Sequence, residues 1–301
     1  MATMAANSAP VGAVGGVGGA GSPGRIWLLA TTTFREAVRK RMVWAVLLLS
    51  AVFLSFYSWG IVRFKETWTA SRGGGLPLSF AQAVDLNVAF GMFIVFFLAA
   101  VMGIFASIGT IAGEIDAGTF QAVLPKPIRR WEVVLGKFTG YALMLAAYIA
   151  LMTAAIAGIV YIVTQHVPAQ LAQAALVIAV AAWWLLALTV LGSTIFATMA
   201  NGIIVYMIYA FGLAATILES IGQLLRIPSL EQSGLIISIV IPSERIYNYA
   251  NYLVQPSTNI GFGGGGGIGG TPPSGFIVPF AVGYLVLLLI GACLVFRRKD
   301  L

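Results

Sequence analysis

Charged side chains are scarce in this chain, because they make up 9% of its 301 residues while hydrophobic residues make up 59%. A soluble globular domain carries about 25% charged residues. The composition therefore excludes an ordinary soluble protein and indicates one embedded in a membrane. The apolar runs do not alternate with polar residues, so they predict helices and not barrel strands. We expect an all-α integral membrane protein.

Cysteine and histidine are almost absent, since the chain has one of each. One cysteine, Cys293, excludes an internal disulfide framework, and we interpret it as a small apolar residue of the last span. A metal site needs several convergent ligands, and none lies near His166 in the sequence. We interpret His166 as a surface-loop residue and expect no metal site.

Six apolar segments are candidates to cross the membrane, with both termini on one side. A bilayer needs about 20 residues of helix, so the longer segments are expected to tilt or to project into water. The fifth is short, which favours a helix backed by re-entrant segments. The expected spans are residues 43–62, 84–112, 133–163, 171–199, 202–218 and 276–296.

The expected spans contain no clearly internal ionisable residue, and Asp85 sits at the end of one. Ion-coupled transporters and intramembrane hydrolases usually need such groups within the membrane. No Ser/His/Asp set occurs, and the five glycines at 263–267 are not followed by the Gly-Lys-Ser/Thr of a phosphate loop. The chain thus shows no catalytic residues, cofactor site or energy source of its own. Energy for uphill transport would have to arrive through its polar surface.

Most basic residues lie on one side of the six spans, which sets the expected orientation. The positive-inside rule puts this side, with both termini, in the cytoplasm. We expect the protein to span the inner (cytoplasmic) cell membrane. Attraction to anionic lipid is enough to explain the net charge of +7, so we expect no nucleic-acid partner. The twelve residues on this side are Arg25, Arg35, Arg39, Lys40, Arg41, Lys126, Arg129, Arg130, Lys137, Arg297, Arg298 and Lys299.

The N-terminal region divides into two parts. Residues 1–24 are rich in glycine and alanine and read as a flexible tail, followed by a single membrane domain over 25–301. Residues 25–41 have the pattern of an amphipathic helix lying at the membrane interface. The alternative is an ordinary basic flank of the first span.

Several shorter features complete the expected architecture. We predict a tight turn at 200–202, which would make the fourth and fifth spans antiparallel neighbours. Residues 219–255 predict short helices on the outer side, one of them opening at 242–245. The glycine-rich stretch 261–275 is typical of a flexible linker. Two glycine pairs, Gly109/Gly113 and Gly136/Gly140, have the spacing that lets helix backbones approach closely.

A charged segment from Gly113 to Lys137 lies between the second and third spans and must sit in water. Thr119 could cap a short helix, which the prolines at 125 and 127 would end. The segment resembles the cytoplasmic loop of type-2 ABC transporter permeases, whose pattern runs Glu-x-x-x-Gly-Thr, a short apolar helix, Lys-Pro, Arg-x-Glu and Gly-Lys. The matching residues are Glu114, Gly118, Thr119, Lys126, Pro127, Arg130, Glu132, Gly136 and Lys137.

This resemblance implies a mechanism and partners. Two permease subunits would pair, as a homodimer or a heterodimer, and each would dock a separate ABC ATPase that binds ATP and Mg. The coupling helix would be 117–124, the segment 25–41 an elbow helix, and 219–255 outer re-entrant helices. Transport would be export. The expected ATPase-coupling residues are Glu114, Asp116, Gly118, Thr119, Phe120, Val123, Leu124, Lys126, Pro127, Arg129 and Arg130.

Two alternatives remain open at this point. A membrane scaffold could use the same loop to recruit a cytoplasmic protein without moving solute. A channel or secondary transporter lined by hydroxyl groups is the third reading, although the lack of internal charge argues against ion coupling. The substrate cannot be read, since the apolar interior suits lipid-like cargo as well as a closed interface.

Overall fold

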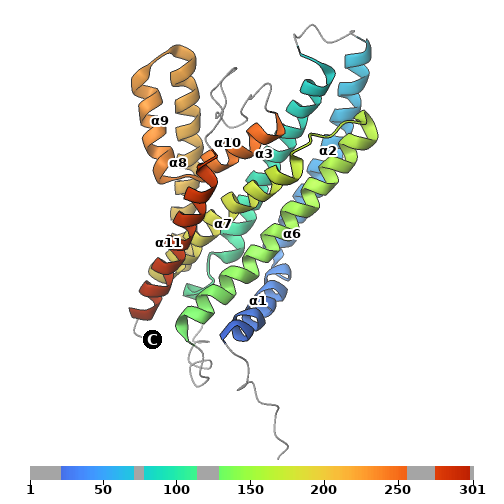
Figure 1. Ribbon diagram of the computed structural model, residues 1–301. Coiled ribbons are helices and arrows are strands. Elements are labelled where there is room, and N and C mark those ends of the chain that lie inside the picture. The colour runs from blue at the N-terminus through green and yellow to red at the C-terminus, as the bar shows by residue number, and fades with distance from the viewer. Residues whose placement is uncertain (1–21, 71–77, 114–128, 256–274, 299–301) are drawn as a thin grey trace, which may run out of the picture.

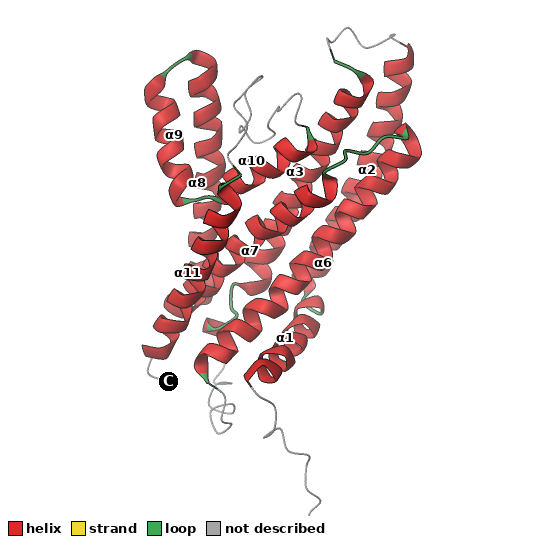
Figure 2. Cartoon of the chain, viewed as in Figure 1, coloured by secondary structure: helices red, strands yellow, loops and turns green. Residues whose placement is uncertain are grey.

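The computed structural model describes residues 22–70, 78–113, 129–255 and 275–298, and all its regular elements there are α-helices (Figures 1 and 2). Helices are expected in an apolar chain, because each satisfies its own backbone hydrogen bonds where water is lacking. In chain order they are α1 (Ser22–Val38), α2 (Arg41–Ala70), α3 (Phe80–Ser107), α6 (Arg130–Thr164), α7 (Leu171–Ile195), α8 (Thr198–Leu225), α9 (Pro228–Val240), α10 (Ser243–Val254) and α11 (Ile277–Arg298).

Within the described ranges, six helices are long and apolar enough to cross a membrane: α2, α3, α6, α7, α8 and α11. They correspond one to one with the six predicted spans, so the predicted fold class is confirmed. The helices α1 and α11 lie with their chain ends at the same end of the bundle, called here the terminal end (Figure 1). The base of the polar loop 113–129, where α3 stops and α6 starts, lies at this end too.

The helices differ strongly in burial. α3 and α7 are mostly buried and form the centre of the bundle, whereas α2 and α11 are mostly exposed on its outside. Large buried side chains such as Phe96, Leu145 and Trp184 belong to α3, α6 and α7. The polar loop therefore departs from α3, one of the two central helices, and enters α6, which is partly buried.

The predicted helix at 25–41 is present as α1, which packs along the first half of α6 (Figure 1). It ends at Val38, and a short connection through Arg39 and Lys40 leads into α2. Its position at a membrane interface remains a prediction.

The predicted turn at 200–202 is misplaced. α7 stops at Ile195, where the Phe196 N–H donates to the Gly192 carbonyl, and α8 begins at Thr198. Asn201 and Gly202 lie inside α8, which continues to Leu225, well beyond the predicted end at 218. The glycine serves packing and not turning, since a Cβ there would overlap Ile108 of the segment that follows α3.

The predicted outer helices appear as α9 and α10, at the end of the bundle opposite the terminal end (Figure 1). α9 begins with a proline and folds back against α8, and α10 crosses α7 and α3. Whether they re-enter a membrane stays a prediction.

Candidate functional site at the base of the polar loop

Most of the predicted coupling residues lie outside the described part of the chain. These are Glu114, Asp116, Gly118, Thr119, Phe120, Val123, Leu124, Lys126 and Pro127. Arg129 and Arg130 are described. The described ends of the loop are Gly113 and Arg129. What the structure offers is the attachment of the loop to the helices, and this attachment is the candidate site.

The loop enters α6 through a capped helix start. The first N–H groups of a helix have no partner within it, and here the Arg129 N–H donates to Glu132 Oε2 at 3.1 Å. Glu132 is 1% exposed. A carboxylate in the first helical turn also interacts favourably with the helix dipole. Glu132, a match of the family pattern, therefore fixes where the loop ends.

Arg130 joins the start of α6 to the end of α11. Its Nη1 atom donates to the carbonyl oxygens of Phe296 at 3.2 Å and Arg297 at 3.3 Å. Its guanidinium also lies 5.9 Å from the centre of the Phe296 ring. The last carbonyls of a helix lack partners within it and carry partial negative charge, so an arginine fits there. The contact links the loop directly to the last helix.

Three side chains from three other places hold the end of α3, where the loop departs. Lys40 Nζ donates to the Ala106 carbonyl at 2.7 Å, Asn201 Nδ2 to the Ile108 carbonyl at 3.0 Å, and Lys137 Nζ to the Thr110 carbonyl at 2.6 Å. Lys40 also contacts the Tyr141 hydroxyl at 2.7 Å. The departing segment is thereby tied to the α1–α2 connection, to α8 and to α6.

The glycine pairs bring backbones together at the same place. A Cβ on Gly136 would lie 2.6 Å from Leu29 Cβ, and one on Gly140 would lie 2.7 Å from the Ala30 carbonyl oxygen, so α1 packs directly on α6. Gly109 faces Thr198 at the start of α8, where its Cβ would meet Cγ2 at 3.1 Å. Both predicted pairs are thus contact sites at the loop base.

Sequence reasoning missed part of this site. The sequence shows Lys40 only as one basic residue among several, because its contacts with Ala106 and Tyr141 span 66 and 101 residues of sequence. Asn201 was assigned to a turn, although an amide inside an apolar run is a signal for a buried hydrogen bond. Lys137 is 8% exposed near the start of α6, a burial that its place in the charged segment did not predict.

At the opposite end, two polar contacts join separate parts of the bundle. His166 Nε2 lies 3.0 Å from Asp85 Oδ1, so His166 does stand in a loop but its side chain links that loop to α3. Arg245 of α10 contacts Glu219 of α8 at 3.2 Å. Across the described ranges no three His, Cys, Asp or Glu side chains gather closely enough for a metal ion.

α10 also carries an acid that the sequence analysis did not single out. Glu244 is 1% exposed, and its Oε1 atom has no hydrogen-bond partner among the described residues. Burial raises the pKa of Glu244 to about 8. The carboxyl is therefore neutral near pH 7, since a neutral group costs less to bury than a charge.

The fold and the loop base define a multi-pass membrane protein in which a polar loop is fastened to several helices. Residues 27–301 match the family described as ABC-2 family transporter protein, and the chain belongs to that family. It is similar to proteins named "Probable ABC transporter permease protein NosY", 27% identical over 123 residues in Stutzerimonas stutzeri and 28% over 122 residues in Pseudomonas aeruginosa. Each match covers 40% of this chain and 40% of the relative's length.

Proposed function

We propose that this chain is the membrane-spanning permease subunit of an ATP-driven exporter, energised by a separate ATPase that docks on the polar loop. The family shows a transmembrane permease of the ABC type, and the relatives' names agree with it. Export, docking and the ATPase partner with its ATP and Mg belong to the proposal.

The observation that carries the proposal is the fastening of both loop ends. Lys40, Asn201 and Lys137 hold the end of α3, and Arg130 holds α11. A force applied to the loop would therefore act on five parts of the bundle at once. Since packed helices transmit displacement through contiguous contacts, such a base suits coupling to a moving partner.

In this mechanism the loop residues have distinct roles. Phe120, Val123 and Leu124 would dock as the apolar face of a coupling helix, with Glu114 and Asp116 on its approach. Exposed ion pairs contribute about 0–1 kcal/mol, so apolar contact would supply most of the docking energy. Two permease chains would pair, and the terminal end would face the cytoplasm of an inner membrane.

A charge reversal at Arg130 tests the coupling role. Arg130→Glu would repel the α11 carbonyls and should lower ATP-driven transport in vesicles by tenfold or more, a loss of about 1.4 kcal/mol in coupling. Arg63→Glu is the matched control, because it makes the same charge change at an exposed residue of α2, far from the base of the polar loop. Both variants should still co-purify with the ATPase if the docking surface is the loop itself.

Two outcomes would decide between the proposal and a scaffold. Tagged chain purified gently from native membranes should bring a stoichiometric ATPase with it. A chain that recruits a non-ATPase protein, or whose complex shows no ATP-dependent solute movement in vesicles, would be a scaffold. Equal transport by the Arg130 and Arg63 variants would remove the loop base from the mechanism.

A further inference from the structure

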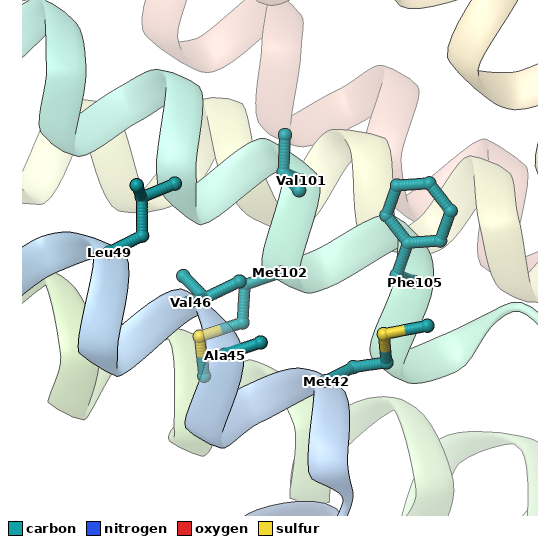
Figure 3. A pocket seen from close by; sticks show the side chains of 7 residues that line it. All are labelled: Met42, Ala45, Val46, Leu49, Val101, Met102 and Phe105. Carbon is teal, nitrogen blue, oxygen red and sulfur yellow. The ribbon is translucent and has the colours of Figure 1, made fainter.

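An apolar groove of about 250 Å³ lies between α2 and α3 near the terminal end (Figure 3). Met42, Ala45 and Leu49 form its α2 wall, and Met102 and Phe105 form much of its α3 wall. All of its lining side chains are apolar. Such walls offer a guest contact but no hydrogen bonds, which suits a hydrocarbon chain.

The groove is open to the outside of the bundle and not sealed by other helices. Met42 is 57% exposed and Leu49 53%, and α2 is mostly exposed along its length. In a membrane, the solvent next to an exposed apolar helix is lipid acyl chain. The groove is thus positioned to receive a chain from the surrounding leaflet.

The end of the groove at the membrane surface is basic. Arg41 lies four residues before Ala45 and eight before Leu49, so the three share one stripe of α2, with Arg41 outermost. Lys40 donates to the carbonyl of Ala106, the residue after Phe105, and so fastens the end of the α3 wall to the α1–α2 connection. Arg39 is exposed in the same connection. The acid of this corner, Glu36, lies 3.8 Å from Lys40.

A second groove lies between α1 and α6. It has a volume of about 420 Å³, is lined by Phe34, Leu143 and Ala147 among others, and has Arg35 in its wall. Arg35 lies in the wall of the second groove beside Thr31, whereas Arg41 lies one helical turn before Ala45, at the end of the first groove. One apolar groove would be ordinary surface relief, but two beside one basic corner indicate recognition of an amphipathic anion.

We propose that the α1–α2 corner binds an anionic phospholipid, with one acyl chain in the groove between α2 and α3 and the phosphate at Arg41. Arginine presents several N–H donors to phosphate oxygens, and a basic residue near the surface contributes about 1 kcal/mol to binding of anionic lipid. Since α1 packs on α6 and Lys40 holds the end of α3, the bound lipid would stabilise the α1–α2 connection beside the loop base.

The test compares retained lipids. The full chain is reconstituted into vesicles of equal phosphatidylglycerol and phosphatidylcholine, re-extracted in mild detergent, and its retained lipids are quantified by mass spectrometry. Wild type should retain more phosphatidylglycerol. Arg41→Gln should lower the ratio of the two lipids about five-fold, equivalent to about 1 kcal/mol. Arg63→Gln, with the same charge change at the far end of α2, should leave the ratio unchanged.

A second variant tests the groove separately from the charge. Ala45→Trp would fill the groove and should reduce the amount of retained phosphatidylglycerol, whereas Leu48→Trp, exposed on α2 outside the groove, should not. Equal retention of both lipids by wild type, or equal effects of the two tryptophans, would overturn the proposal. A change of oligomeric state in Ala45→Trp at constant lipid retention would show instead that the groove faces a second copy of the chain.

Discussion

Two lysines bind helix ends at opposite ends of the molecule, and their surroundings differ. Lys137 donates to the Thr110 carbonyl after α3, and Lys65 donates to the Val163 carbonyl near the end of α6, each at 2.6 Å. Lys137 is 8% exposed, whereas Lys65 is exposed to solvent. The same bond is therefore made once in the interior and once at the surface.

The comparison shows where the bundle can rearrange. Water can replace an exposed donor, so opening the Lys65 contact costs little. Water cannot readily replace Lys137, because losing its ammonium would leave a buried carbonyl without its partner. Of these two lysine contacts, the one at the terminal end is thus hard to open, while the one at the opposite end can exchange with solvent.

Among the matched pairs of variants, the largest expected effect comes from removing the buried donor. Lys137→Met keeps the length of the side chain but removes its bond to Thr110, and it should lower stability by about 1.5–3 kcal/mol. Lys65→Met, the matched control, should change stability by about 0.5 kcal/mol or less. Thermal unfolding of both variants in detergent measures the difference, and equal losses would contradict the comparison.

Close packing at the terminal end predicts the next largest effect. Gly140→Ala would place a Cβ 2.7 Å from the Ala30 carbonyl oxygen, so α1 must shift, at a cost of about 1–2 kcal/mol. Gly158→Ala on the same helix meets nothing within 4 Å and should be neutral or stabilising by up to about 1 kcal/mol. Unfolding temperatures of the pair test this, and a harmless Gly140→Ala would place α1 farther from α6.

The sequence predicted the fold through hydropathy, because each of the six spans is long and apolar. It could not place the turn between α7 and α8. Asn201 and Gly202 have turn propensity, but burial of the Asn201 amide against the Ile108 and Thr189 carbonyls keeps them in a helix. Tertiary hydrogen bonds therefore decided that boundary.

The candidate site was predictable only in part. Arg130, Gly136 and Lys137 stood out through the family pattern, and Gly140 through its spacing from Gly136. Their partners could not be read, since Arg130 reaches a carbonyl 166 residues away and Lys40 one 66 residues away. Such contacts depend on how the helices pack, which periodicity does not specify.

Glu244 allows the opposite end to be tested by pH. Its pKa rises from 4.5 to about 8 on burial, so the folded state holds a proton that the unfolded state has released between these values. Stability should then be highest below about pH 4.5, fall as pH rises, and level off above about pH 8. Glu244→Gln should flatten this profile in thermal unfolding measured from about pH 5 to about pH 9. An unchanged slope would show that Glu244 does not hold the proton.

The smallest effect is expected at the His166–Asp85 contact. Its loss can be compared directly with the loss of the buried Lys137 bond at the terminal end. The side chains of His166 and Asp85 are 36% and 17% exposed, so solvent already competes for the bond. His166→Ala should therefore cost about 1 kcal/mol or less, well under the loss in Lys137→Met. Thermal unfolding of the two variants side by side measures the ratio. If removing His166 cost as much as removing Lys137, polar contacts at the two ends would be equally rigid, and the terminal end would lose its distinction as the fastened part of the bundle.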